Sequence, residues 1–172
     1  TKQITTFGSR PAKVTQENVK FVYCKDEYAR INTFMDWWQN NTPEVVTGWN
    51  CELYDIPYLV GRISRLMGEK VAKKLSPWNI VRVNEVTISG RKQLSCDIAG
   101  VSIIDYLDLY KKSPATPNQE SYRLDHIAFM ELGQNKLDHS EYDTFRDFYS
   151  NNWQKFVEYN IVDVELVDRL ED

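Results

Sequence analysis

The chain has 172 residues, of which 42% are hydrophobic and 27% are charged, and these proportions are typical of a globular protein rather than a disordered segment. No run of residues approaches the roughly 18 consecutive apolar positions of a membrane-spanning helix. The formal net charge of −4 gives no sign of an overall basic surface, so a nucleic-acid partner would require a local basic patch or bound metal ions. The three cysteines form no close pair, which indicates reduced thiols rather than a zinc or redox motif.

The first half of the chain alternates short apolar runs with helical patterns. Strands are expected at 2–7, 19–24 and 44–50, and helices at 27–39, 57–67 and 69–75. Pro57 suits the first turn of its helix, and Gly68 suits the position just after the end.

The second half changes its period. Apolar and polar residues alternate on both sides of Ser89–Gly90, which predicts a β-hairpin. A strand that continues into a helix follows at 100–112. Further helices are expected at 121–133, with Ser121 as N-cap and Gly133 as stop, and from about 152 to 170. Strands interleaved with helices indicate an α/β fold with a mixed sheet.

A polar turn follows the buried strand at 44–50 and carries Asn50, Glu52 and Asp55. In α/β folds ligands gather at such strand ends, so Asp55 is a candidate functional carboxylate. Two structural interpretations stay open: Asp55 is also a good helix N-cap, and Asn50 is a common turn residue.

The last helix carries Tyr159 and Asp163, which are four residues apart and therefore share one face beside its apolar stripe. A carboxylate at such a seam is costly unless it is hydrogen-bonded or bound to a cation, although a surface acid beside a half-buried tyrosine is the simpler alternative. Together with Asp55, these hard oxygen ligands suit Mg²⁺ or Mn²⁺. Two such ions about 3.5–4 Å apart can support in-line hydrolysis of a phosphodiester.

Two motifs resemble the 3′→5′ exonuclease domain of family B DNA polymerases. WNCELYDIPYL at 49–59 resembles the second motif of that domain, and YNIVD at 159–163 resembles the third, Tyr-x-x-x-Asp. The segments SIIDYLDLYKK, SYRLDHIAFMELG and KLD at 136–138 are also similar, especially to the T-even-like phage branch. The resemblance covers nearly the whole chain.

The resemblance implies a ribonuclease-H-like mixed sheet flanked by helices, with a protruding hairpin, in a single domain over 1–172. It also implies removal of 3′-terminal nucleotides from DNA during proofreading, with two Mg²⁺ or Mn²⁺ ions in the complete site. Asp55 and Asp163 would bind metal, and Tyr159 would hydrogen-bond the attacking water or the scissile phosphate. Asn50 would shape the pocket for the 3′-terminal nucleotide.

The implied partners are single-stranded or frayed primer–template DNA and the polymerase domain of the same protein, in the host cytoplasm and without a membrane. Arg91 and Lys92 near the hairpin tip suit phosphate contact, although a solvated charged turn is equally consistent with them.

One departure from the family is large. The first motif of the family is Asp-x-Glu on a first central strand. No such motif precedes the other two motifs in this sequence, either before the strand that starts at Lys2 or after it. Because metal affinity depends on ligand number and charge, we expect this chain alone to bind Mg²⁺ poorly and to have little nuclease activity. Two other hypotheses are a module that binds a DNA end without cleaving it and a purely structural domain.

Overall fold

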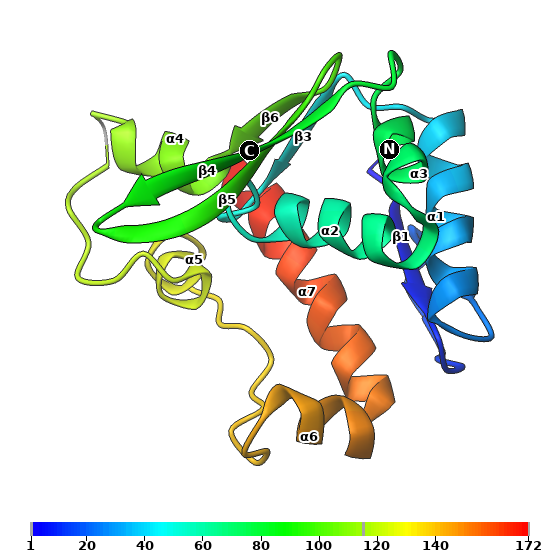
Figure 1. Ribbon diagram of the computed structural model, residues 1–172. Helices are drawn as coiled ribbons and strands as arrows, with labels where there is room; N and C mark the ends of the chain where they lie inside the picture. The colour runs from blue at the N-terminus through cyan, green and yellow to red at the C-terminus, as the bar shows by residue number, and fades with distance from the viewer. Residues whose placement is uncertain (1, 115, 172) are drawn as a thin grey trace. The chain divides into compact units, whose positions relative to one another are not determined.

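The computed structural model describes residues 2–114 and 116–171 and contains both helices and strands, which confirms the predicted α/β class (Figure 1). The chain divides into two compact units. Unit 1 comprises Thr1–Arg30 and Gln119–Asp172, and unit 2 comprises Ile31–Asn118. The prediction of a single domain over 1–172 stays a prediction.

Unit 1 combines one pair of strands with three helices. The strands β1 (Ile4–Gly8) and β2 (Val19–Tyr23) are parallel. The helices are α5 (Leu124–Leu132), α6 (Phe145–Asn151) and α7 (Trp153–Glu171). Both α5 and α6 contact α7, and Val157 and Ile161 of α7 pack on Val19 of β2. The apolar stripe predicted for the last helix therefore forms a small core with this strand pair.

Unit 2 contains two further strand pairs and most of the remaining helices. The strands β3 (Val45–Gly48) and β6 (Ser102–Asp105) pair in parallel, whereas β4 (Val81–Ile88) and β5 (Arg91–Ile98) pair antiparallel. The helical elements are α1 (Glu27–Asn40), whose first turn belongs to unit 1, α2 (Asp55–Met67), α3 (Glu69–Ala72), the short 3₁₀ helix η1 (Lys73–Leu75) and α4 (Tyr106–Lys112).

The core of unit 2 lies between α1, α2 and the hairpin. Met35 and Trp38 of α1, Ile63 of α2 and Ile98 of β5 are all buried in one cluster. The indole N–H of Trp38 donates a 2.8 Å hydrogen bond to the carbonyl of Leu75, so the one polar group of this large side chain is satisfied inside the core.

The hairpin turn lies where the sequence predicts it. Ile88 pairs with Arg91, and the two residues between them, Ser89 and Gly90, both have positive φ. Such a turn matches the right-handed twist of the two strands. Figure 1 shows β4 and β5 as a long two-stranded ribbon.

The predicted single mixed sheet is not observed among the residues that the structure describes. The strands form three separate two-stranded sheets, β1–β2, β3–β6 and β4–β5. One continuous sheet would require a strand that hydrogen-bonds to two of these pairs, and no strand within 2–114 and 116–171 does so. In the same part of the chain, no helix is long and apolar enough to cross a membrane.

Candidate active site

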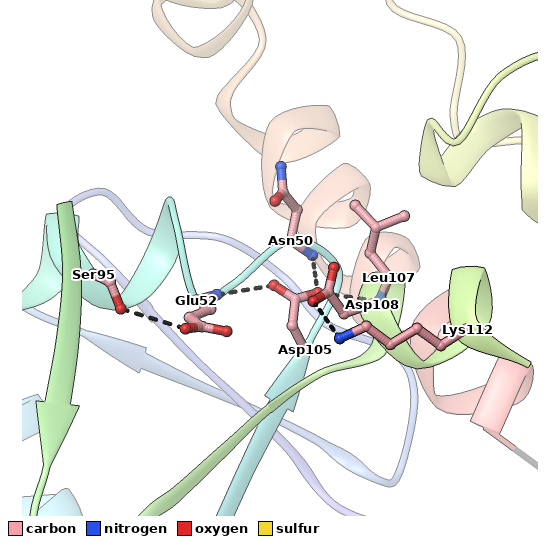
Figure 2. Close-up of polar contacts among 7 residues, drawn as sticks. All are labelled: Asn50, Glu52, Ser95, Asp105, Leu107, Asp108 and Lys112. Atoms are coloured by element: carbon pink, nitrogen blue, oxygen red, sulfur yellow. Dashed lines mark hydrogen bonds and ion pairs between the residues drawn. The ribbon is translucent and has the colours of Figure 1, made fainter. Parts of the chain in front are cut away.

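The turn after β3 is held by a buried carboxylate (Figure 2). Asp105, the last residue of β6, is 7% exposed. Its Oδ1 accepts hydrogen bonds from the backbone N–H groups of Asn50, at 2.8 Å, and Leu107, at 3.0 Å. Its Oδ2 accepts from the N–H of Glu52 at 3.0 Å. Because β3 and β6 are parallel neighbours, their carboxyl ends meet, and Asp105 can reach the turn that follows β3.

Asn50 lies in this turn with a φ of 62°, the left-handed region that asparagine tolerates better than most residues. The structure therefore agrees with the interpretation of Asn50 as a turn residue, and its predicted role beside a terminal nucleotide stays a prediction. The ring of Trp49 lies 5.9 Å from that of Tyr110, and this contact anchors the start of the turn on α4.

Asp55 is the first residue of α2, which begins two residues earlier than the sequence predicts. The N-cap position belongs to Tyr54, which makes no side-chain capping bond, so the alternative in which Asp55 caps the helix is not observed. Desolvation and the nearby charge of Asp105 raise the pKa of Asp55, although a hydrogen bond to its own backbone opposes the rise. A carboxylate in a first turn is favoured by the helix dipole.

Cys51 lies inside the same turn and is 4% exposed. Burial, together with the negative charges of Asp105 and Asp55, raises the pKa of the Cys51 thiol to about 12. The thiol is therefore protonated and unreactive at neutral pH.

A second polar cluster lies in unit 1, on α7 and the segment before α6. The Nζ of Lys136 donates to Asp163 Oδ2 at 2.9 Å and to the hydroxyl of Tyr159 at 3.4 Å. The backbone N–H of Lys136 donates to Asp125 Oδ1 of α5 at 2.9 Å, which fixes this part of the chain against α5. The predicted juxtaposition of Tyr159 and Asp163 on one helix face is thus present, with Lys136 between their polar atoms.

Asp163 is only partly compensated by this lysine. Its side chain is 28% exposed, and its Oδ1 is buried with no hydrogen-bond partner in the described part of the chain. Burial raises the pKa of Asp163 despite the opposing effects of Lys136, and the negative charge of Asp125 adds to the rise. Burial alone would lower the pKa of Lys136, but the hydrogen bond and charge of Asp163 outweigh it and the pKa is raised.

Aromatic rings cover Tyr159, which is 7% exposed. The rings of His139, Phe145 and Phe148 lie 5.2, 5.8 and 5.8 Å from the Tyr159 ring. Burial, followed by the charge of Asp163, raises the pKa of the Tyr159 hydroxyl. The phenol is therefore protonated at neutral pH and can donate a hydrogen bond.

The two basic residues near the hairpin tip differ in their surroundings. Lys92, 74% exposed, forms a 2.7 Å ion pair with Glu85 on the neighbouring strand. Arg91, beside the turn, is exposed. Part of the positive charge predicted for phosphate contact is therefore already offset within the hairpin.

The side-chain oxygens of these clusters meet only part of what a hard cation requires from its ligands. A buried carboxylate oxygen without a donor, as at Asp163, is the kind of group that a divalent ion satisfies. However, the described residues include no group of three or more His, Cys, Asp or Glu side chains placed to hold a metal ion. Asp55 belongs to unit 2 and Asp163 to unit 1, so the prediction that they share one site stays a prediction.

The sequence pattern indicates no role for two residues of these clusters. Lys136 lies in the KLD segment and Asp105 in the SIIDYLDLYKK segment, and neither stands out by periodicity or spacing. The aspartate directly before a helical pattern indicates an N-cap, which Asp105 is, but nothing in the sequence points to its bonds with the turn at 50–52.

Comparison with known proteins identifies the family. The sequence model of a protein family, DNA polymerase family B, exonuclease domain, matches residues 2–127 of this chain. The matched range includes both Asp55 and Asp105. The chain is 40% identical to the DNA-directed DNA polymerase of Escherichia phage RB69 over 83% of its length, and 33% identical to that of Enterobacteria phage T4 over 90%. A DNA polymerase of Paramecium bursaria Chlorella virus NY2A is 28% identical over 77% of the chain.

The matched regions are 15% of the RB69 polymerase and 17% of the T4 polymerase, so the chain spans about one sixth of the length of these relatives. The family match covers well over half of this chain, and these two relatives are both more than 30% identical to it. The chain belongs to the exonuclease domain family of family B DNA polymerases.

Proposed function

We propose that the chain is a 3′→5′ proofreading exonuclease domain that removes 3′-terminal nucleotides from DNA, working beside the polymerase domain of the same protein. Membership of the family supports the reaction class. The observation that carries the proposal for this chain is the Asp163 carboxylate, which has one oxygen on Lys136 and the other buried with no donor among residues 2–114 and 116–171. A divalent cation is a group that satisfies a buried carboxylate oxygen of this kind.

Four side chains have separate roles in the proposed reaction. Asp163 through Oδ1, and Asp55 at the start of α2, would hold the divalent ions that family B exonuclease domains use. When bound, Mg²⁺ or Mn²⁺ ions supply the charge that stabilises phosphodiester hydrolysis. Lys136 holds the orientation of the Asp163 carboxylate through its 2.9 Å bond. The Tyr159 hydroxyl, protonated and close to Asp163, would donate to the attacking water or to a phosphate oxygen.

The DNA-binding elements of this proposal lie in unit 2. Asn50 would line the pocket for the terminal nucleotide, and Arg91 and Lys92 would contact phosphates of the strand. The finer fold of the proposal is a ribonuclease-H-like arrangement with a protruding hairpin. The antiparallel β4–β5 pair supports the hairpin, whereas one continuous mixed sheet is not part of the proposal, because the described strands form separate pairs.

A cleavage assay tests the function. The protein at its natural length is incubated with 5′-labelled single-stranded DNA and Mg²⁺ or Mn²⁺. We expect stepwise shortening from the 3′ end, and a rate lowered more than about 100-fold by Asp55→Ala or Asp163→Ala. The loss should exceed the 10–100-fold cost of removing an outer partner of a metal ligand. Asp108→Ala is the matched control, because this exposed acid on α4 forms a 3.3 Å ion pair with the surface residue Lys112 and has no role in the proposed site.

The outcomes separate the hypotheses. Cleavage that survives Asp163→Ala would refute the assigned site. Salt-sensitive binding of single-stranded DNA without any cleavage would favour a non-catalytic DNA-end module instead. In that binding assay, replacing Arg91 and Lys92 together by alanine should reduce the slope of log affinity against log salt by about 1.4, since each phosphate contact on a single strand contributes about 0.7.

A further inference from the structure

We propose that Asp105 is a positioning residue of the proposed exonuclease site: its carboxylate fixes the turn that carries Asn50 and Glu52, and thereby fixes Asp55 at the start of α2. This inference rests on the proposed function. Asp105 does not touch the substrate in this proposal, and it acts through the turn.

The hydrogen bonds of Asp105 exceed what its role at α4 requires. Capping α4 needs one bond, and the N–H of Leu107 supplies it at 3.0 Å. The other two bonds go to Asn50 and Glu52, which lie 55 and 53 residues earlier in the chain. Figure 2 shows the carboxylate between the turn on one side and α4 on the other.

The turn needs such a partner because two of its backbone N–H groups require an acceptor. Asn50 has a φ of 62°, which asparagine tolerates better than most residues, and the surrounding hydrogen bonds offset the remaining cost of this left-handed conformation. The N–H groups of Asn50 and Glu52 point to the same side and would be unsatisfied without an acceptor there. A buried carboxylate meets both needs at once.

The turn is coupled directly to α2. The N–H of Ile56 donates to the carbonyl of Cys51 at 3.0 Å, and Asp55 lies between these two residues in sequence. A displacement of the turn therefore displaces the first turn of α2 and the Asp55 carboxylate with it. Glu52 adds a second support, because its Oε1 accepts a 3.3 Å hydrogen bond from the hydroxyl of Ser95 on β5.

Three variants separate positioning from helix capping. Asp105→Ser keeps a good N-cap for Leu107, but its side chain is too short to reach the turn. Asp105→Asn keeps one acceptor oxygen, and its amide N–H₂ faces one of the two donors of the turn. Thr144→Ala is the matched control, since Thr144 caps α6 through a 3.0 Å bond from the N–H of Asp147.

The experiment uses the protein at its natural length and two readouts. Exonuclease kcat and KM are measured on single-stranded DNA, and amide hydrogen exchange is followed by mass spectrometry on peptides covering 48–58. For Asp105→Ser we expect kcat to fall on the order of 10- to 100-fold, as for a misplacement of about 1 Å, with KM within about twofold of wild type. Exchange at 48–58 should accelerate, while exchange in β4 and α1 stays unchanged. Asp105→Asn should lie between wild type and Asp105→Ser, and Thr144→Ala should cleave like wild type.

Several results would overturn the inference. Wild-type turnover by Asp105→Ser, or unchanged exchange at 48–58, shows that Asp105 acts only as a cap. Equal losses of kcat in Asp105→Ser and Thr144→Ala show a general effect of lost stability. If the wild-type protein does not shorten DNA at all, the proposed function fails. If the wild-type protein shortens DNA and the Asp105 variants shorten it at the same rate, the proposed function stands and the role of Asp105 fails.

Discussion

Lys136 and Asp163 should show a measurable coupling energy in their effects on stability, because both side chains are mostly shielded from water. Their charged atoms are 2.9 Å apart, and the side chains are 21% and 28% exposed. At an effective dielectric constant of about 20, the gross attraction at this distance is about 5–6 kcal/mol. Solvent screening and the ordering of both side chains reduce this attraction to a coupling energy of about 1–2 kcal/mol, whereas the desolvation of each group is a separate cost that cancels in a double-mutant cycle.

A double-mutant cycle on the 172-residue chain measures this coupling. Lys136→Met, Asp163→Asn and the double variant are unfolded in urea, and the free energy of unfolding is taken from far-UV circular dichroism. Lys136→Met should be the more destabilising single change, because it removes the cation that the half-buried Asp163 carboxylate is hydrogen-bonded to and leaves that carboxylate near Asp125.

A second cycle on Lys112 and Asp108 is the matched control. This pair is also bridged directly, at 3.3 Å, but its side chains are 77% and 57% exposed, so its coupling should be only about 0.3–0.5 kcal/mol. Equal coupling energies in the two cycles would refute the reasoning, since burial is the feature that is expected to strengthen the first pair most.

Two further predictions concern packing and titration. Gly8→Ala should destabilise the chain by about 1–3 kcal/mol, because the added Cβ would lie 2.6 Å from the Phe21 ring; Gly61→Ala, whose Cβ meets nothing within 4 Å in α2, should instead stabilise it by about 0.5–1 kcal/mol in urea unfolding. The Cys51 thiol should resist alkylation at pH 8 until the chain unfolds. Because its folded pKa of about 12 lies above the ordinary value near 8.5, its stabilising contribution is complete below pH 8.5 and is lost as the pH rises toward 12. The stability cost of Cys51→Ala should therefore shrink between pH 8 and pH 11, and a cost that is independent of pH would contradict this.

The elements that the sequence predicts well are those with strong local patterns. The 3.6-residue period predicts α1, α2 and α7 to within a few residues, and alternation about Ser89–Gly90 predicts the hairpin and its turn. The short helix α6 is missed, although Thr144 followed three residues later by Asp147 is an N-terminal pattern that could have predicted it.

Helix starts are less certain where a polar side chain has a choice of partners. Ser121 is predicted to cap its helix, but α5 begins only at Leu124. The Ser121 hydroxyl instead accepts a 3.4 Å bond from the N–H of Arg123, two residues on, so the serine closes a local turn before the helix.

The polar clusters could be predicted only in part, because their partners are distant in sequence. Tyr159 and Asp163 share a helix face, which local spacing determines. Lys136 reaches Asp163 across 27 residues, and Asp105 reaches Asn50 across 55. A sequence window as long as one helix or strand therefore never contains both members of either pair. Topology supplies the second contact, since parallel pairing of β3 and β6 brings their carboxyl ends together.

The three aspartates that matter here differ in how well their carboxylates are satisfied. Asp105 is buried with three N–H donors, and it therefore stabilises the backbone around it. Asp55 and Asp163 have raised pKa values through desolvation, so each ionised carboxylate destabilises the folded state at neutral pH. A chain optimised for stability alone would replace or fully pair such groups. Within the residues that the structure describes, Asp163 keeps one buried oxygen without a donor and Asp105 keeps none, which is the physical reason for placing ligand binding at Asp163 and support of the turn at Asp105.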